Sequence, residues 1–216
     1  MAWFRRDGSW SLLLLFCAYL YSGLMSLSHL LTFPGAILMG RALVASSEQA
    51  TAWIFAGWTN GFALLILIAV SLEARSDHHR VPANRAGQAA ATALCLVPVA
   101  VVIVTTAAVK LELPRLVTGS DFTGLSWMVR WLSIILLGSS IALILFVMRE
   151  PSDLYLWLSW ALAAMVFYTL LSAIGGARFS VGWYVGRSSW LVSAWSIFVY
   201  FVLRFSRQFR GSAKVP

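Results

Sequence analysis

The sequence predicts an all-α, polytopic membrane helix bundle with about six transmembrane helices. Of its 216 residues, 60% are hydrophobic and 11% are charged, whereas a soluble domain carries about a quarter of its residues as Asp, Glu, Lys or Arg. Long apolar runs separate the charges, and about 20 apolar residues at a rise of about 1.5 Å cross the hydrocarbon core of a bilayer. This composition excludes an ordinary cytosolic enzyme, a disordered chain and a secreted disulfide scaffold.

Six apolar runs have close to the length of a bilayer. In lipid the backbone of each run must satisfy its own hydrogen bonds, which requires helices and excludes open strands. No run shows the alternation of apolar and polar residues that is typical of a membrane β-barrel. We expect a cytoplasmic N-terminus at residues 1–10, a six-helix membrane domain at 11–203 and a basic cytoplasmic tail at 204–216. The expected spans are Ser11–Leu31, Ala50–Leu72, Gln88–Val109, Trp127–Met148, Leu154–Ile174 and Ser188–Leu203.

The distribution of Lys and Arg predicts the orientation of these helices. Ten lie on the side of both termini and six on the other side, so the positive-inside rule places both termini in the cytoplasm. The net charge of +8 therefore indicates sidedness and no nucleic-acid partner. The ten are Arg5, Arg6, Arg75, Arg80, Arg85, Arg149, Arg204, Arg207, Arg210 and Lys214, and the six are Arg41, Lys110, Arg115, Arg130, Arg178 and Arg187.

The first helix has a second interpretation, as a signal peptide. Arg5 and Arg6 precede the apolar run Leu12–Leu20, and Ser26-Leu27-Ser28 imitates a cleavage site. The apolar stretch continues to Leu31, beyond the length of a usual signal peptide, so a retained helix is favoured. Cleavage would leave five helices with the C-terminus still inside.

Polar groups near the outer ends of the first two helices are candidate binding residues. Pro34 and Gly35 end the first helix about one turn after His29. His29 has two interpretations: its ring is hydrogen-bonded among the lipid headgroups, or it forms the polar, proton-sensitive wall of a binding site. In the second helix, Asn60 would lie inside the membrane, where burying a side-chain amide without a hydrogen-bond partner costs free energy. Asn60 is therefore either interhelical glue beside the Gly57–Gly61 packing pair or a ligand contact, with the ring of Trp58 nearby.

The last outer loop, Gly175–Arg187, carries four glycines, three aromatic residues and two arginines within thirteen residues. An aromatic belt at the membrane interface explains Trp183 and Tyr184. Arg178 and Arg187 lie on the side that should be poor in arginine, and anion or headgroup binding explains them better.

Nothing in the sequence indicates catalysis. No metalloprotease, phosphate-loop or serine-elbow motif is present. The pair His78-His79 lacks a third ligand, and Cys17 and Cys95 lie in separate apolar runs without metal or disulfide spacing. We therefore expect no enzyme activity, no metal and no cofactor.

These motifs resemble the fourth family of MASE-type membrane-associated sensor domains. The match is carried by Ser28-His29-Leu-Leu-Thr32-Phe33-Pro34-Gly35, by Thr51-Ala-Trp53 and Trp58…Gly61-Phe62, and by Arg178…Arg187. The resemblance implies a bacterial inner-membrane sensor of the kind usually joined to a cytoplasmic histidine kinase or diguanylate cyclase. The chain ends at Pro216 without such a domain, so we expect any output to come from a partner.

The expected function is a sensory input domain that detects a small ligand or a membrane state near the outer face. Its expected partners are membrane lipids and a kinase or cyclase output protein. A second copy of the chain, forming a homodimer, is a further candidate partner. The alternatives are a small transporter or channel lined by Asn60 and Arg130, and a structural subunit that packs through Gly57–Gly61 and Ser139-Ser140. The candidate ligand-binding residues are His29, Thr32, Phe33, Trp58, Asn60, Arg178, Trp183, Tyr184 and Arg187.

Overall fold

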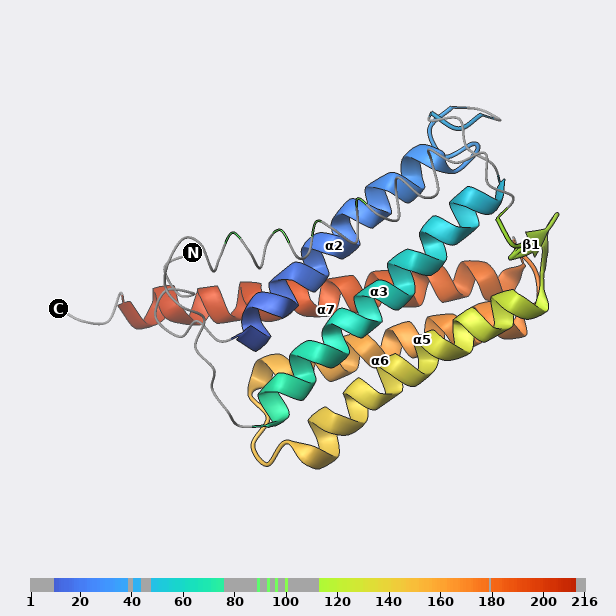
Figure 1. Cartoon of the computed structure of the whole chain (residues 1–216). Coiled ribbons are helices and arrows are strands. Elements are labelled where there is room, and N and C mark those ends of the chain that lie inside the picture. Colours follow the sequence, from blue (N-terminus) through green and yellow to red (C-terminus); the bar gives the residue numbers. More distant parts are fainter. Residues whose placement is uncertain are drawn as a thin grey trace. The chain divides into compact units, whose positions relative to one another are not determined.

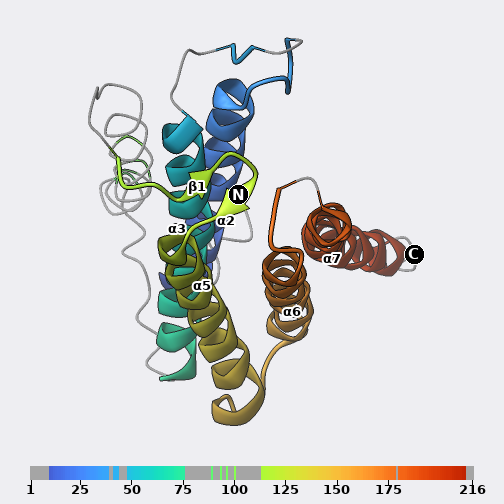
Figure 2. The same cartoon turned by 90° about the vertical axis from the view of Figure 1, so that its right-hand side faces the viewer.

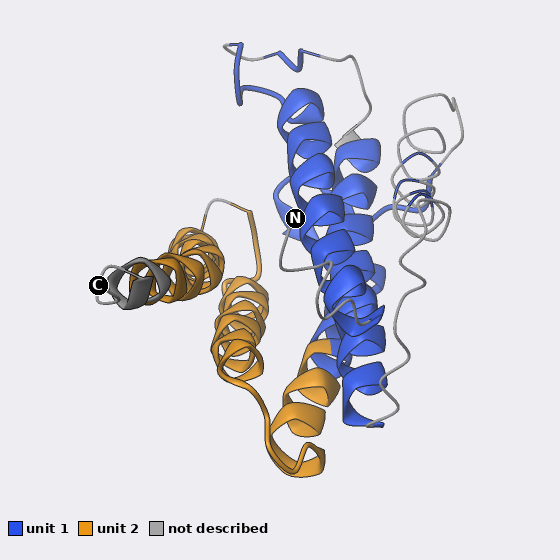
Figure 3. Cartoon of the chain, turned by 90° about the vertical axis from the view of Figure 1, so that its left-hand side faces the viewer, with its two compact units in different colours: residues 1–136 blue, residues 137–216 orange. Residues whose placement is uncertain are grey.

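The computed structural model describes residues 10–38, 41–43, 48–75, 89, 93, 96, 100, 113–178 and 180–212. The chain forms two compact units, Met1–Leu136 and Leu137–Pro216 (Figure 3). Among the described residues, five helices are long and apolar enough to cross a membrane, which confirms the all-α membrane fold. The remaining expected span, Gln88–Val109, lies outside the described residues apart from four isolated positions.

Unit 1 is built on a pair of long antiparallel helices, α2 (Trp10–Thr32) and α3 (Glu48–Ala74). They lie side by side, as Figures 1 and 2 show. Hydrogen bonds join them at both ends. At one end the Thr51 hydroxyl donates to the Thr32 carbonyl oxygen at 3.0 Å, and at the other Ser11 Oγ donates to Glu73 Oε2 at 2.5 Å. The largest side chains fully buried in this pair are Tyr21, Met25, Ile54, Ile66 and Val70.

Helix α2 ends where the sequence predicts. Pro34 disfavours helical geometry at Phe33, and Gly35 has a φ of 81°, which glycine adopts without steric cost. The amide of Phe33 still donates to the carbonyl of His29 at 2.9 Å. His29 therefore lies in the last turn of α2, as expected.

A short hairpin that the sequence analysis did not predict precedes the next long helix. Its strands are β1 (Val117–Thr118) and β2 (Asp121–Phe122), paired antiparallel. Gly119, with a φ of 60°, supplies the left-handed residue of the tight turn. The exclusion of strands holds for the spanning segments that the structure describes, because this hairpin lies outside them.

The hairpin is held against the start of α3. Gln49 Nε2 donates to the carbonyl of Val117 at 2.6 Å, and Gln49 Oε1 accepts from the amide of Leu116 at 2.9 Å. The indole of Trp53 donates to the carbonyl of Pro114 at 2.9 Å. One glutamine thus satisfies backbone groups that the two-residue strands leave unpaired.

Helix α5 (Gly124–Ala142) follows the hairpin and continues as a π-helix, η1 (Leu143–Val147). The Thr123 hydroxyl accepts from the amide of Ser126 at 3.3 Å, which caps the first turn. The helix therefore starts three residues before the expected span at Trp127, because a threonine cap extends it beyond its apolar run.

Unit 2 contains a second helix pair, α6 (Asp153–Ile174) and α7 (Val181–Ser212), which lie side by side (Figure 2). Helix α7 contains the expected last span, Ser188–Leu203, and begins seven residues before it, at Val181. Ser180 is the reason. Its hydroxyl accepts from the amide of Trp183 at 3.2 Å and its carbonyl from the amide of Tyr184 at 3.1 Å, so the helix is capped there.

Large apolar side chains on α6 and α7 face outward. Trp160 is 74% exposed, and Trp195 and Phe198 are also exposed. Monomeric soluble proteins rarely expose apolar surface on this scale. Lipid chains would cover these side chains, and the protein is accordingly a multi-pass membrane protein.

Candidate functional site

Four aromatic rings gather at the end of α2 and the first half of α3. We call His29, Phe33, Phe55 and Trp58 the α2–α3 aromatic cluster. The His29 ring centroid lies 5.5 Å from that of Phe33, 5.4 Å from Phe55 and 6.1 Å from Trp58, and His29 is only 9% exposed. The imidazole is thus enclosed by three rings, one from the end of its own helix and two from α3, so its contacts depend on how the two helices pack.

Hydrogen bonds lock this cluster in position. The indole of Trp58 donates to Ser22 Oγ at 2.8 Å, which ties α3 to α2 about two helical turns before the histidine. Thr32, also a predicted site residue, is buried; its hydroxyl donates to the carbonyl of Ser28 while its own carbonyl accepts from Thr51. Thr32 thus joins the end of α2 to the start of α3.

The structure brings together three of the predicted residues, His29, Phe33 and Trp58, and adds Phe55, which the sequence analysis missed. Residues three apart share a helix face, and Phe55 lies three positions before Trp58 in α3. Helical spacing counted back from Trp58 would have identified it.

Asn60 does not belong to this cluster. Two positions after Trp58, it points about 200° around the helix. Its Oδ1 accepts from Ser133 Oγ of α5 at 3.0 Å, and its Nδ2 donates to the carbonyl of Ala56 at 3.0 Å. Both ends of the amide are therefore bonded within the protein, as the interpretation of Asn60 as interhelical glue predicts.

This bond predicts a measurable coupling between α3 and α5. In a double-mutant cycle of Asn60→Leu and Ser133→Ala, we expect the two substitutions to be non-additive by about 0.6 to 1.7 kcal/mol, the range for hydrogen bonds between membrane helices. The free energy of unfolding would be measured by titration with a denaturing detergent. Strictly additive effects would show that the bond does not join the helices.

Arg130, the other residue proposed to line a transport path, lies near the start of α5 and contacts the hairpin. Its guanidinium carbon lies 3.9 Å from the ring centroid of Phe122 in β2, and its Nε is 3.4 Å from Ser126 Oγ. A cation held over an aromatic face gains electrostatic attraction from the ring. Arg130 therefore holds the start of α5 against the hairpin.

A second cluster forms in unit 2 at the start of α7. We call Trp183, Tyr184 and Arg187 the α7 aromatic–arginine cluster. The guanidinium carbon of Arg187 lies 4.3 Å from the Trp183 ring centroid, and the rings of Trp183 and Tyr184 meet edge to face with centroids 4.9 Å apart. Arg187 is half-buried while Tyr184 is exposed. These residues were predicted in a loop, but they lie in the first two turns of α7.

Glycines allow this end of α7 to approach α6 closely. A Cβ on Gly186 would lie 3.0 Å from the Tyr168 ring, and one on Gly182 would lie 2.7 Å from the carbonyl oxygen of Leu171. Tyr168 in turn stacks on Trp190, with ring centroids 5.3 Å apart. The glycines of the predicted loop therefore serve helix packing.

The predicted site thus divides between the two units. His29, Thr32, Phe33 and Trp58 gather in unit 1, whereas Trp183, Tyr184 and Arg187 gather in unit 2. Arg178 lies in the turn between α6 and α7 and is half-buried. Within the part of the chain that the structure describes, no group of three His, Cys, Asp or Glu side chains could hold a metal ion; His78, His79 and Cys95 lie outside that part.

A comparison with protein families matches residues 1–207 to MASE4, described as "Membrane-associated sensor, integral membrane domain". The chain belongs to the MASE4 family. The match includes both clusters and most of α7, so this MASE4 domain is a sensory membrane domain by family, and its long apolar helices agree with an integral membrane domain. No curated protein and no solved structure matches the chain significantly.

Proposed function

We propose that this MASE4 domain detects an anionic amphipathic ligand, or a change in the surrounding membrane, at its outer face and transmits the change along α7 to a cytoplasmic output domain or partner. The observation that carries the proposal is the continuity of α7, a single helix of 32 residues. At about 1.5 Å per residue it is about 48 Å long, against a hydrocarbon core of about 30 Å. One rigid element thus connects Trp183 and Arg187 to Arg204 and Arg207.

The α7 aromatic–arginine cluster has the chemistry for an amphipathic anion. Arg187 rests on an indole face, so its planar guanidinium is held in one orientation, and preorganised arginine suits bidentate pairing with a carboxylate or phosphate. The exposed ring of Tyr184 provides apolar surface beside the charge. A ligand that changes these contacts acts directly on the first two turns of α7.

The α2–α3 aromatic cluster is a second responsive element in this proposal. His29 is nearly buried among three aromatic rings, so an added proton or a changed lipid contact there alters how α2 packs on α3. Its test is separate from that of Arg187, because the two clusters belong to different units.

The proposed orientation places both termini in the cytoplasm of the bacterial inner membrane. It rests on the excess of Lys and Arg on the side of the termini. The proposed output protein is a histidine kinase or a diguanylate cyclase, the classes that the family resemblance implies.

The structure favours sensing over the two alternatives. The polar groups proposed to line a transport path are engaged in packing, Asn60 with Ser133 and Arg130 with Phe122. The Gly57–Gly61 face proposed for a partner chain is covered within unit 1 by Tyr21, whose hydroxyl donates to the Gly57 carbonyl at 2.6 Å.

The test is a fusion of the full chain to a diguanylate cyclase domain, with cyclic di-GMP as the readout. Octanoate serves as an amphipathic anion and octanol as its uncharged counterpart. We expect octanoate to change the output of the parent fusion more than octanol does. Arg187→Gln should remove most of that difference, and His29→Gln should change the basal output. Arg41→Gln, which alters an exposed arginine on the same predicted side, is the matched control. Unchanged output and response in both test variants would refute the site assignment.

A further inference from the structure

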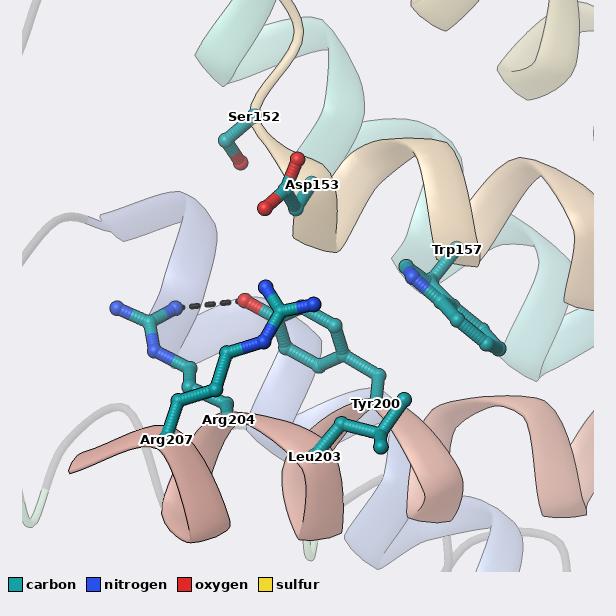
Figure 4. A pocket seen from close by; sticks show the side chains of 7 residues that line it. All are labelled: Ser152, Asp153, Trp157, Tyr200, Leu203, Arg204 and Arg207. Atoms are coloured by element: carbon teal, nitrogen blue, oxygen red, sulfur yellow. Dashed lines mark hydrogen bonds between the residues drawn. The ribbon is translucent and has the colours of Figure 1, made fainter. Parts of the chain in front are cut away.

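A pocket opens between α6 and α7 at the end of unit 2 opposite to the α7 aromatic–arginine cluster. Its volume is about 730 Å³, and Asp153 and Trp157 of α6 and Tyr200, Arg204 and Arg207 of α7 line it. Figure 4 shows these side chains converging from the two helices. The sensing proposal makes no use of this pocket.

Positive charge predominates in the pocket. Arg204 Nη1 donates to the Tyr200 hydroxyl at 2.6 Å, and Figure 4 shows the guanidinium groups of Arg204 and Arg207 on either side of that hydroxyl. Asp153 contributes one negative charge against these two positive ones. The N-terminus of α6, where Asp153 lies, adds a partial positive charge. Two guanidiniums and a phenol are the donors that a phosphate group pairs with.

A second, apolar pocket between the same two helices shares a lining residue with the first. Leu156, Trp157, Trp160 and Ser196 line it, its volume is about 430 Å³, and it shares Trp157 with the charged pocket. Ser196 precedes Arg204 by eight residues, about 12 Å along α7, so the apolar pocket lies deeper in the membrane. Trp160, which is 74% exposed, forms its outer wall.

We propose that the two pockets bind one anionic phospholipid in the leaflet at the C-terminal end of α7. The phosphodiester headgroup pairs with Arg204 and Arg207, and an acyl chain lies against Trp157 and Trp160. Basic pockets between membrane helices commonly receive such headgroups. A soluble phosphate compound would use only the charged pocket, whereas a lipid fills both, which is why the lipid is favoured. In the proposed orientation this is the cytoplasmic leaflet, so the bound lipid would hold the end of α7 that leads to the output.

The experiment uses the full chain purified in detergent, with lipid binding followed by native mass spectrometry. Phosphatidylglycerol is the anionic probe, and phosphatidylcholine with the same acyl chains is the zwitterionic one. We expect phosphatidylglycerol to bind more tightly, and Arg207→Gln to weaken its binding about five-fold, the effect of one arginine near an anionic headgroup. Asp153→Asn should strengthen that binding, and Trp160→Ala should weaken the binding of both lipids.

Arg149→Gln is the matched control, because Arg149 is an exposed arginine that closely precedes α6 and does not line the pocket. Equal losses for Arg149→Gln and Arg207→Gln would show diffuse surface charge and overturn the site. Displacement of phosphatidylglycerol by equimolar glycerol 3-phosphate would overturn the assignment to a lipid. Each variant must keep the helical circular dichroism and elution volume of the parent chain, so that lost binding is not lost folding.

Discussion

Replacing Gly61 with alanine is expected to lower the free energy of unfolding by about 1–3 kcal/mol, the usual cost of overpacking. A Cβ at this position would lie within 3 Å of three Tyr21 side-chain atoms, including the hydroxyl. Tyr21 cannot easily yield, because it is 2% exposed and its hydroxyl donates to the Gly57 carbonyl. The measurement is unfolding in a titration with denaturing detergent, followed by circular dichroism.

Gly23→Ala is the control for this prediction. Gly23 lies on α2, and a Cβ there has no atom within 4 Å. Alanine should therefore stabilise that position by up to about 1 kcal/mol through helix propensity alone. Adding Tyr21→Phe to Gly61→Ala should restore part of the lost stability, since it removes the closest atom. Equal losses for Gly61→Ala and Gly23→Ala would contradict the close approach of α2 and α3.

Gly182→Ala is expected to have an effect of similar size, about 1–3 kcal/mol, in unit 2. The new Cβ would lie 2.7 Å from the carbonyl oxygen of Leu171 and 3.1 Å from the Cα of Gly175. Both atoms belong to the backbone at the end of α6, so relief requires the start of α7 to move away. The same detergent titration measures the stability. In the cyclase fusion, this variant should also lose the response to octanoate.

Gly138→Ala provides the comparison in unit 2. Gly138 is also helical, but a Cβ there meets no atom within 4 Å. We expect its stability to be equal to or above that of the parent chain. If Gly182→Ala proved as harmless as Gly138→Ala, the close contact between the start of α7 and the end of α6 would be wrong.

Local sequence chemistry was sufficient to predict most of the helices and one part of the site. The apolar runs at Ser11–Leu31, Ala50–Leu72 and Leu154–Ile174 match α2, α3 and α6 within about two residues. The reason is that each segment by itself must span the bilayer and must satisfy its own backbone hydrogen bonds. Pro34 and Gly35 likewise end α2 by their own steric properties. The position of His29 at that end followed directly.

Other features depended on contacts between distant residues and could not be read from any single segment. The hairpin has strands of two residues and is held by Gln49, which lies 68 positions before Val117 in the chain. Composition suggested a loop for Trp183 and Arg187, but the Ser180 cap and glycines that fit against α6 make that stretch helical. Asn60 accepts a hydrogen bond from Ser133, which lies 73 positions later in the chain.

The sequence alone thus determined that the chain crosses the membrane repeatedly and where most of its described spans lie, since these depend on hydrophobicity and backbone chemistry within each segment. The tertiary structure decided which polar and aromatic residues meet. It gave Asn60 and Arg130 their contacts, divided the predicted site into two clusters and revealed the pocket of Arg204 and Arg207. Such meetings depend on the rotation of each helix and on the side chains facing it, and neither is encoded in one helix by itself.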